Sequence, residues 1–210
     1  MTETNQQDVK EAVREVVKSG DNVHQQVKDI TLEALTKGRL DIENIKNVTE
    51  AVGKGINEGM TSHGGHGKEV FIHAVTALDD ALATAAEAST LAIEEAASKV
   101  TDYSQHDLDD AVKDIQDMEE MFFDTLEKVA KDSNHIVADI VNDFIAHSRQ
   151  SGTAVGEQTL IALDALKDLP KISRDIIVSS TAATTSTLAQ IASGILQGIA
   201  ESLKPSHSKK

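Results

Sequence analysis

The chain contains no cysteine, no tryptophan, one tyrosine and two prolines among its 210 residues. The absence of cysteine excludes disulfide bonds and thiolate metal sites, and it is typical of a reducing compartment. Because aromatic residues make up only 2% of the chain, alanine, valine, isoleucine and leucine must build the core. The two prolines, Pro170 and Pro205, lie near the C-terminus, so no proline interrupts a helix before them. We therefore expect an all-α protein.

Positive charge is also scarce, since 20 lysine and arginine residues stand against 35 acidic ones, a net charge of -15. A surface of this sign repels a phosphate backbone, so nucleic acid is excluded as an expected partner. The opening residues, MTETNQQDVK, have neither the basic nor the apolar region of a secretion signal. We expect a cytoplasmic protein.

One stretch lacks charge altogether. Residues 176–200, IIVSSTAATTSTLAQIASGILQGIA, contain no acidic or basic side chain. The stretch is long enough to cross about 30 Å of hydrocarbon, but ten of its 25 residues are serine, threonine or glutamine. We expect a continuous helix without a transmembrane span, lying against an apolar surface either inside a bundle or on a partner.

The spacing of apolar residues predicts a short-helix N-terminal portion in residues 1–60. Apolar stripes with spacings of three and four predict three helices, separated at Gly20 and Gly38, with Asp41 capping the third. Three glycines are expected to weaken the end of the third helix: Gly53, Gly55 and Gly59. A loop rich in glycine and histidine follows over residues 61–67.

In residues 68–204, apolar residues alternate at spacings of three and four. This pattern predicts four long helices with coiled-coil-like heptad seams, arranged as an elongated antiparallel bundle. The third helix continues without a slip in its apolar pattern to about residue 169. Pro170 then forces a turn, so the last helix is expected to fold back on the third as a hairpin. Residues 205–210 are expected to form a disordered tail.

Small residues indicate where these last two helices should meet. Gly152 and Gly156 are four residues apart, as are Gly194 and Gly198, and this spacing lets two helices approach closely. The candidate interface comprises Ile176, Leu188, Ile191, Gly194, Ile195, Gly198, Ile199, Gly152 and Gly156. These residues are expected either to be buried among the other helices or to contact a partner, a second copy or a lipid-like surface.

Three histidines near the glycine-rich loop, His63, His66 and His73, are weak candidates for a metal site. No cysteine is present and no carboxylate completes a metal motif with them, so we expect micromolar affinity for Zn or Ni at best, and no resident cofactor. The loop also lacks the Gly-Lys-Ser/Thr ending of a phosphate-binding loop, and no nucleophile stands in a recognisable catalytic pattern. We expect no enzymatic activity.

Two segments carry a family resemblance. SGTAVGEQ, residues 151–158, and LAQIASGILQGIAESLKP, residues 188–205, are similar to an uncharacterised family of bacterial alanine-rich helical proteins, over most of the chain. That family implies no activity. The alanine-rich heptads and the Ser/Thr/Ala-rich apolar helix also resemble phasins, the helical proteins that coat polyester storage granules. This second resemblance implies an oligomeric, granule-associated and non-enzymatic protein.

The sequence thus predicts a structural or interaction protein that self-associates, as a homo-oligomer, or adsorbs to a hydrophobic granule or lipid surface through its last two helices. Two alternatives stay open at this point. One is a metal-binding helical bundle that uses the His63–His66 loop. The other is a membrane-inserting or pore-forming helical protein.

Overall fold

The computed structural model describes residues 3–61, 67–98, 105–167 and 185–203, and every regular element within these ranges is an α-helix. The expectation of an all-α fold is confirmed for this part of the chain. Its helices are α1 (Glu3–Ser19), α2 (Val23–Thr36), α3 (Ile42–Met60), α4 (Gly67–Ser98), α5 (Gln105–Asp132), α6 (His135–Ser151), α7 (Ala154–Lys167) and α8 (Thr185–Leu203). The expected tail, residues 205–210, lies outside the described residues.

The breaks between the three short N-terminal helices lie where the sequence predicts, at Gly20 and at Gly38 to Asp41. Gly20 follows α1 in a left-handed conformation, with φ of 74°, and its N–H group donates to the carbonyl of Val16. Asp41 caps α3, because its carboxylate accepts a 2.9 Å hydrogen bond from the backbone N–H of Asn44. These local signals suffice because each acts within a few residues of the helix end.

The third helix of this portion packs closely against the first. An added Cβ at Gly55 would lie 2.5 Å from the carbonyl oxygen of Lys10, and one at Gly59 would lie 2.7 Å from the Cβ of Val17. The glycines do not end α3, which continues to Met60, so the weakening of its end stays a prediction. Gly55 and Gly59 remove side-chain bulk where α1 and α3 meet, and Gly53 does so where α3 meets Thr125 of α5.

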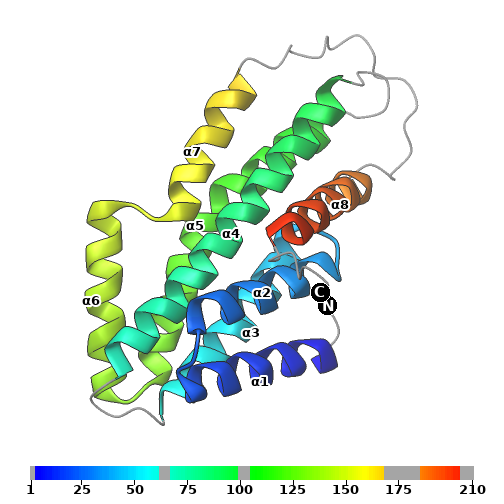
Figure 1. Cartoon of the computed structure of the whole chain (residues 1–210). Coiled ribbons are helices and arrows are strands. Elements are labelled where there is room, and N and C mark those ends of the chain that lie inside the picture. Colours follow the sequence, from blue (N-terminus) through cyan, green and yellow to red (C-terminus); the bar gives the residue numbers. More distant parts are fainter. Residues whose placement is uncertain (1–2, 62–66, 99–104, 168–184, 204–210) are drawn as a thin grey trace.

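The longest helix, α4, lies at the centre of the molecule, with α2, α5, α7 and α8 packed around it (Figure 1). The apolar residues that recur along it at spacings of three and four, Phe71, Val75, Leu78 and Leu82, are fully buried, and the buried face is wider than this stripe. Eight alanines have at most 1% of their surface exposed: Ala74, Ala77, Ala81, Ala85, Ala86, Ala88, Ala92 and Ala96. Because alanine adds little bulk, several helices can approach α4 at once. Among the described helices, α4 is therefore the one most enclosed by its neighbours. The last helix, α8, lies at the periphery.

The expected third long helix is interrupted in its middle. Gly152 ends α6 with φ of 86°, and its N–H group donates to the Ser148 carbonyl at 2.8 Å. The chain resumes as a separate helix at Ala154, and α6 and α7 lie at an angle to each other (Figure 1). The prediction of one continuous helix is therefore wrong, and with it the bundle of four uninterrupted long helices.

The last helix does not pair with α7. α8 packs on α4 and α2, and in Figure 1 it lies on the other side of α4 from α7. The hydroxyl of Ser193 donates to the carbonyl oxygen of Gly38 at 2.8 Å, which satisfies a carbonyl group after the end of α2. The expected hairpin of the last two helices is thus wrong, while Pro170 itself lies outside the described residues.

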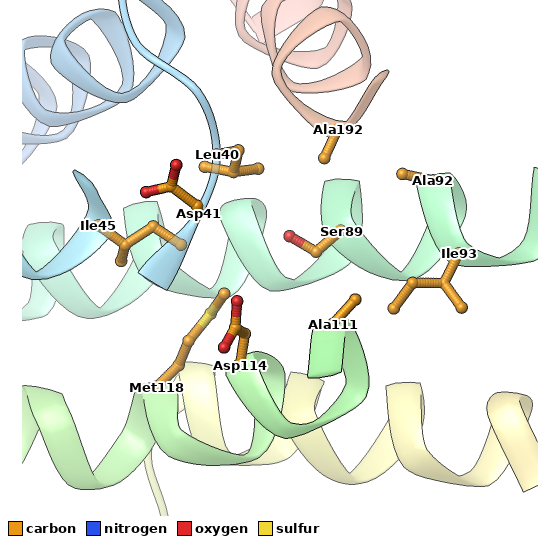
Figure 2. A pocket seen from close by; sticks show the side chains of 10 residues that line it. All are labelled: Leu40, Asp41, Ile45, Ser89, Ala92, Ile93, Ala111, Asp114, Met118 and Ala192. Carbon is orange, nitrogen blue, oxygen red and sulfur yellow. The ribbon is translucent and has the colours of Figure 1, made fainter. Parts of the chain in front are cut away.

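The side chain of Asp114, on α5, lies beside the start of α3 (Figure 2). Burial raises the pKa of its carboxyl group, the backbone N–H of Ile42 lowers it, and the charges of Asp110, Asp117 and Asp41 raise it further. The net result is a pKa of about 6 instead of the usual 3.8. The folded chain therefore binds a proton at this position more tightly than the unfolded chain does.

We predict that Asp114→Asn stabilises the protein at neutral pH. Because the folded-state pKa lies above the unfolded one, the stability contributed by Asp114 is fully present below pH 3.8 and is lost as the pH rises through 6. Because water partly screens this side chain, we expect the variant to be more stable by about 1 kcal/mol at pH 7.5. Urea unfolding at pH 5 and pH 7.5 measures it, and equal stability differences at both values would contradict it.

Candidate interaction surface

The buried carboxylate of Asp79 on α4 fixes the position of α7. Its two oxygens accept hydrogen bonds from the first two backbone N–H groups of that helix, Ala154 at 2.8 Å and Val155 at 2.9 Å. Asp79 is 7% exposed, and it is separated from these partners by 75 residues of chain. A negative charge at the positive end of a helix is favourable, so α7 starts where Asp79 holds it.

Thr153 completes the start of α7. Its hydroxyl accepts from the N–H of Gly156 at 3.0 Å and donates to the carboxylate of Glu119 on α5 at 2.7 Å. The first three N–H groups of α7 are therefore bonded to side chains of Asp79 and Thr153. Because the partners come from α4 and α5, this helix end is anchored to both long helices.

The surroundings of Asp79 raise the pKa of its carboxyl group. Burial raises the pKa of its carboxyl group, while the two N–H bonds from Val155 and Ala154 lower it. The negative charges of Asp80 and Glu119 add to the increase. The N–H groups at the start of α7 therefore stabilise the ionised carboxylate, whereas burial and the two nearby negative charges destabilise it.

The exposed side of α7 carries two large apolar side chains between the exposed acidic residues Glu157 and Asp164. Its inner face buries Val155, Thr159 and Ala162 against α4 and α5. On the opposite side, Leu160 is 70% exposed and Ile161 is 53% exposed, the two most exposed large apolar side chains of the described residues. We call these two side chains, with the exposed Ala165 one turn later, the α7 outer face. An apolar group of this kind is a candidate contact surface.

The described residues of α8 turn their apolar side toward the core. Ile191, Ile195 and Ile199 are partly buried and pack against the core. The exposed positions of the helix are glycine or polar, namely Gly194, Gln197, Gly198, Glu201 and Ser202. The backbone of Leu188 is helical, but its side chain and all of Ile176 lie outside the described residues.

The predicted glycine contact between the last two helices does not form. A Cβ added at Gly194 or Gly198 would meet nothing within 4 Å, so these glycines do not mark a close approach among the described residues. Gly152 lies in the break between α6 and α7, and an added Cβ there would also meet nothing within 4 Å. Gly156 is buried, but its neighbour is the side chain of Glu119 on α5.

The predicted histidine cluster is only partly described. His63 and His66 lie outside the described residues, whereas His73 is on α4 with its Nε2 atom 3.8 Å from the carboxylate of Glu69. Within the described ranges, no three histidine, cysteine or acidic residues gather as metal ligands. Weak metal binding by the loop stays a prediction.

Sequence reasoning missed both Asp79 and the α7 outer face. A signal for Asp79 was present, since it directly follows Leu78 in the apolar stripe of α4 and a charge beside such a stripe needs a buried partner. No local signal identifies that partner, because the N–H groups of α7 become available only where the chain breaks at Gly152. The exposure of Leu160 and Ile161 depends on the same break.

Comparison with known proteins finds a matching family model but no activity. A family model described as a family of unknown function, DUF6781, matches residues 1–205. No curated protein matches the chain, and no solved structure matches it. Among the described residues, no helix is both long and apolar enough to cross a membrane.

Proposed function

We propose that this chain, which belongs to the DUF6781 family of proteins of unknown function, is a non-enzymatic interaction protein. It self-associates or adsorbs to a hydrophobic surface, such as a storage granule or a lipid droplet, through the α7 outer face. The observation that carries this proposal is the exposure of two adjacent large side chains, Leu160 at 70% and Ile161 at 53%. Transfer of such side chains from water to an apolar surface is favourable.

The anchoring of α7 supports an adsorbing role. A helix that binds through its outer side needs its inner side held in place, and Val155 and Ala162 have no exposed surface against α4 and α5. Asp79 and Thr153 bond the first N–H groups of α7, so the helix does not have to fray to meet a partner. The α7 outer face is therefore presented on a fixed support, which reduces the entropy lost on binding.

The net charge of the protein supports adsorption through the α7 outer face alone. With a net charge of -15, most of the surface stays hydrated and repels other copies of the chain. An adsorbed layer would accordingly turn its acidic sides to water, as the resemblance to phasins implies. Self-association would increase with added salt, because salt screens the repulsion between copies.

A non-catalytic role accords with how three buried or partly buried polar groups are used. Asp79, Thr153 and Ser193 bond to backbone groups at helix ends or to a neighbouring side chain. Each of these groups stabilises the arrangement of helices, which is the requirement of a scaffold for a binding surface.

The test is a single charge on the α7 outer face. We predict that Leu160→Asp leaves the helical circular dichroism unchanged, because the side chain is already in water, and lowers adsorption to polyester particles or lipid droplets about tenfold or more. Co-sedimentation measures adsorption, and light scattering measures the oligomeric state.

Ile136→Asp is the matched control, since Ile136 on α6 is 45% exposed and the substitution adds the same charge away from the α7 outer face. Ile136→Asp should adsorb as the unaltered protein does. If Leu160→Asp still adsorbs and self-associates normally, or if both variants lose binding equally, the proposal is wrong. Loss of self-association alone would assign the surface to a second copy of the chain.

A further inference from the structure

Two acidic side chains are helical neighbours of the exposed apolar pair on α7. Glu157 precedes Leu160 and Ile161 by three and four residues. Asp164 follows the same two residues by four and three, and both acidic residues are exposed. Side chains at these spacings lie on one side of a helix, with Cβ atoms about 5–6 Å apart. Any surface that Leu160 and Ile161 touch therefore comes close to two carboxylates.

No basic side chain on the described part of α7 offsets these charges. Residues 154–165, whose side chains are described, include no lysine, arginine or histidine. The nearest basic residue before them in the chain is Arg149, whose guanidinium group pairs with Glu127 at 3.1 Å and lies 5.0 Å from the centre of the Phe123 ring. A helix that binds anionic lipids presents lysine and arginine beside its apolar side chains. The α7 outer face has neighbours of the opposite charge.

We propose that the α7 outer face binds an uncharged apolar surface, such as polyester or triacylglycerol, and not an anionic lipid surface. This inference rests on the proposed function and names the class of surface to which the protein adsorbs. On an uncharged surface, Leu160 and Ile161 leave water while the two carboxylates stay hydrated at the edge of the contact. Anionic headgroups would repel these carboxylates at distances shorter than the Debye length, about 10 Å at 0.1 M salt, so dissolved ions screen the repulsion only in part.

The same charges disfavour a second copy of the chain as the occupant. Two α7 outer faces in contact would bring Glu157 and Asp164 of one copy near the same residues of the other. Each copy also has a net charge of -15, so the two copies repel each other as they approach. An uncharged surface has no such cost.

The experiment measures flotation of the full-length protein with triacylglycerol droplets at low salt. The droplets are coated with phosphatidylcholine alone, with added anionic phosphatidylglycerol, or with an added cationic trimethylammonium lipid. We expect adsorption to the phosphatidylcholine droplets to be about tenfold tighter than adsorption to the anionic droplets, because two carboxylates lie in the field of the headgroups. Added salt should reduce this difference.

A pair of double variants separates the local charges from the net charge. Glu157→Gln with Asp164→Asn should strengthen adsorption to the anionic droplets about tenfold and change adsorption to the phosphatidylcholine droplets by less than about twofold. The control, Asp8→Asn with Asp21→Asn, neutralises two exposed carboxylates on and just after α1, at the other end of the molecule from α7 (Figure 1). It should leave adsorption to both kinds of droplet unchanged. Circular dichroism checks that each variant is folded.

Equal adsorption of the unaltered protein to neutral and anionic droplets would overturn this inference. So would an unchanged response of folded Glu157→Gln with Asp164→Asn, or an equal response of the control, which would assign the selection to net charge. Adsorption only to droplets with the cationic lipid would overturn it in favour of a basic partner. If the unaltered protein adsorbs to every droplet and Leu160→Asp does not, the proposed function stands and only the charge selection is wrong.

Discussion

Gly55→Ala is expected to destabilise the protein by about 3 kcal/mol, although alanine is the better helix former. The added Cβ would lie 2.5 Å from the carbonyl oxygen of Lys10 and 2.8 Å from the Cβ of Val13, both on α1. Because one of these neighbours is backbone, α1 as a whole must move away from α3 to relieve the overlap. Urea unfolding followed by circular dichroism measures the loss.

Gly194→Ala is the matched control for this prediction. Gly194 is also in a helix and also has a glycine four residues later, but a Cβ there would meet nothing within 4 Å. We expect stabilisation by about 0.5–1 kcal/mol, the difference in helix propensity between the two residues. Opposite signs for the two variants would support the close contact of α1 with α3, and equal signs would contradict it.

Asp79→Ala is expected to cost about 2–4 kcal/mol and to loosen α7 first. The substitution leaves the N–H groups of Ala154 and Val155 without their acceptors at a position where Val155 is fully buried. Amide hydrogen exchange should become much faster at these two positions before it changes in α4. Thermal unfolding measures the overall loss.

The neighbouring residue provides the control for Asp79. Asp80 is about a third exposed and pairs with His24 at 3.0 Å and with Lys28 at 3.9 Å. Asp80→Ala removes the same charge from the same helix and should cost less than about 1 kcal/mol, as exposed ion pairs do. If the two variants lose equal stability, the capping of α7 by Asp79 contributes little.

Asp79 also connects stability to the proposed function. Asp79→Ala should weaken adsorption because it loosens the helix that carries Leu160 and Ile161, whereas Leu160→Asp should weaken adsorption in a protein of unchanged stability. Burial raises the pKa of Asp79, so the pH-dependent part of its contribution is largest below the unfolded-state pKa and is lost as the pH rises through the folded-state pKa. The two hydrogen bonds that its oxygens accept from α7 do not depend on that proton.

The helical class and the N-terminal helix boundaries could be predicted because their causes are local. Gly20 ends α1 through its own backbone conformation, and Asp41 caps α3 through a residue three positions later. The buried stripe of α4 follows from the helical period of its apolar residues. Such signals require no knowledge of the rest of the chain.

Which of the glycine pairs would lie at a close contact between helices could not be predicted, because that depends on residues far away in the sequence. Gly55 with Gly59, Gly152 with Gly156, and Gly194 with Gly198 share one spacing, yet only the first pair meets another helix backbone.

The helical class of the described chain, the residues that share a helical face and the ends of the first helices follow from the order of the amino acids. The break of the third long helix at Gly152 follows from packing, because the N–H groups of Ala154 and Val155 are satisfied by Asp79 on α4, 75 and 76 residues earlier. Packing also decides that α4 is the enclosed helix and that α7 exposes Leu160 and Ile161. The physical reason is that residue spacing defines the faces of a helix, whereas its partner is chosen by packing and by buried hydrogen bonds between distant parts of the chain.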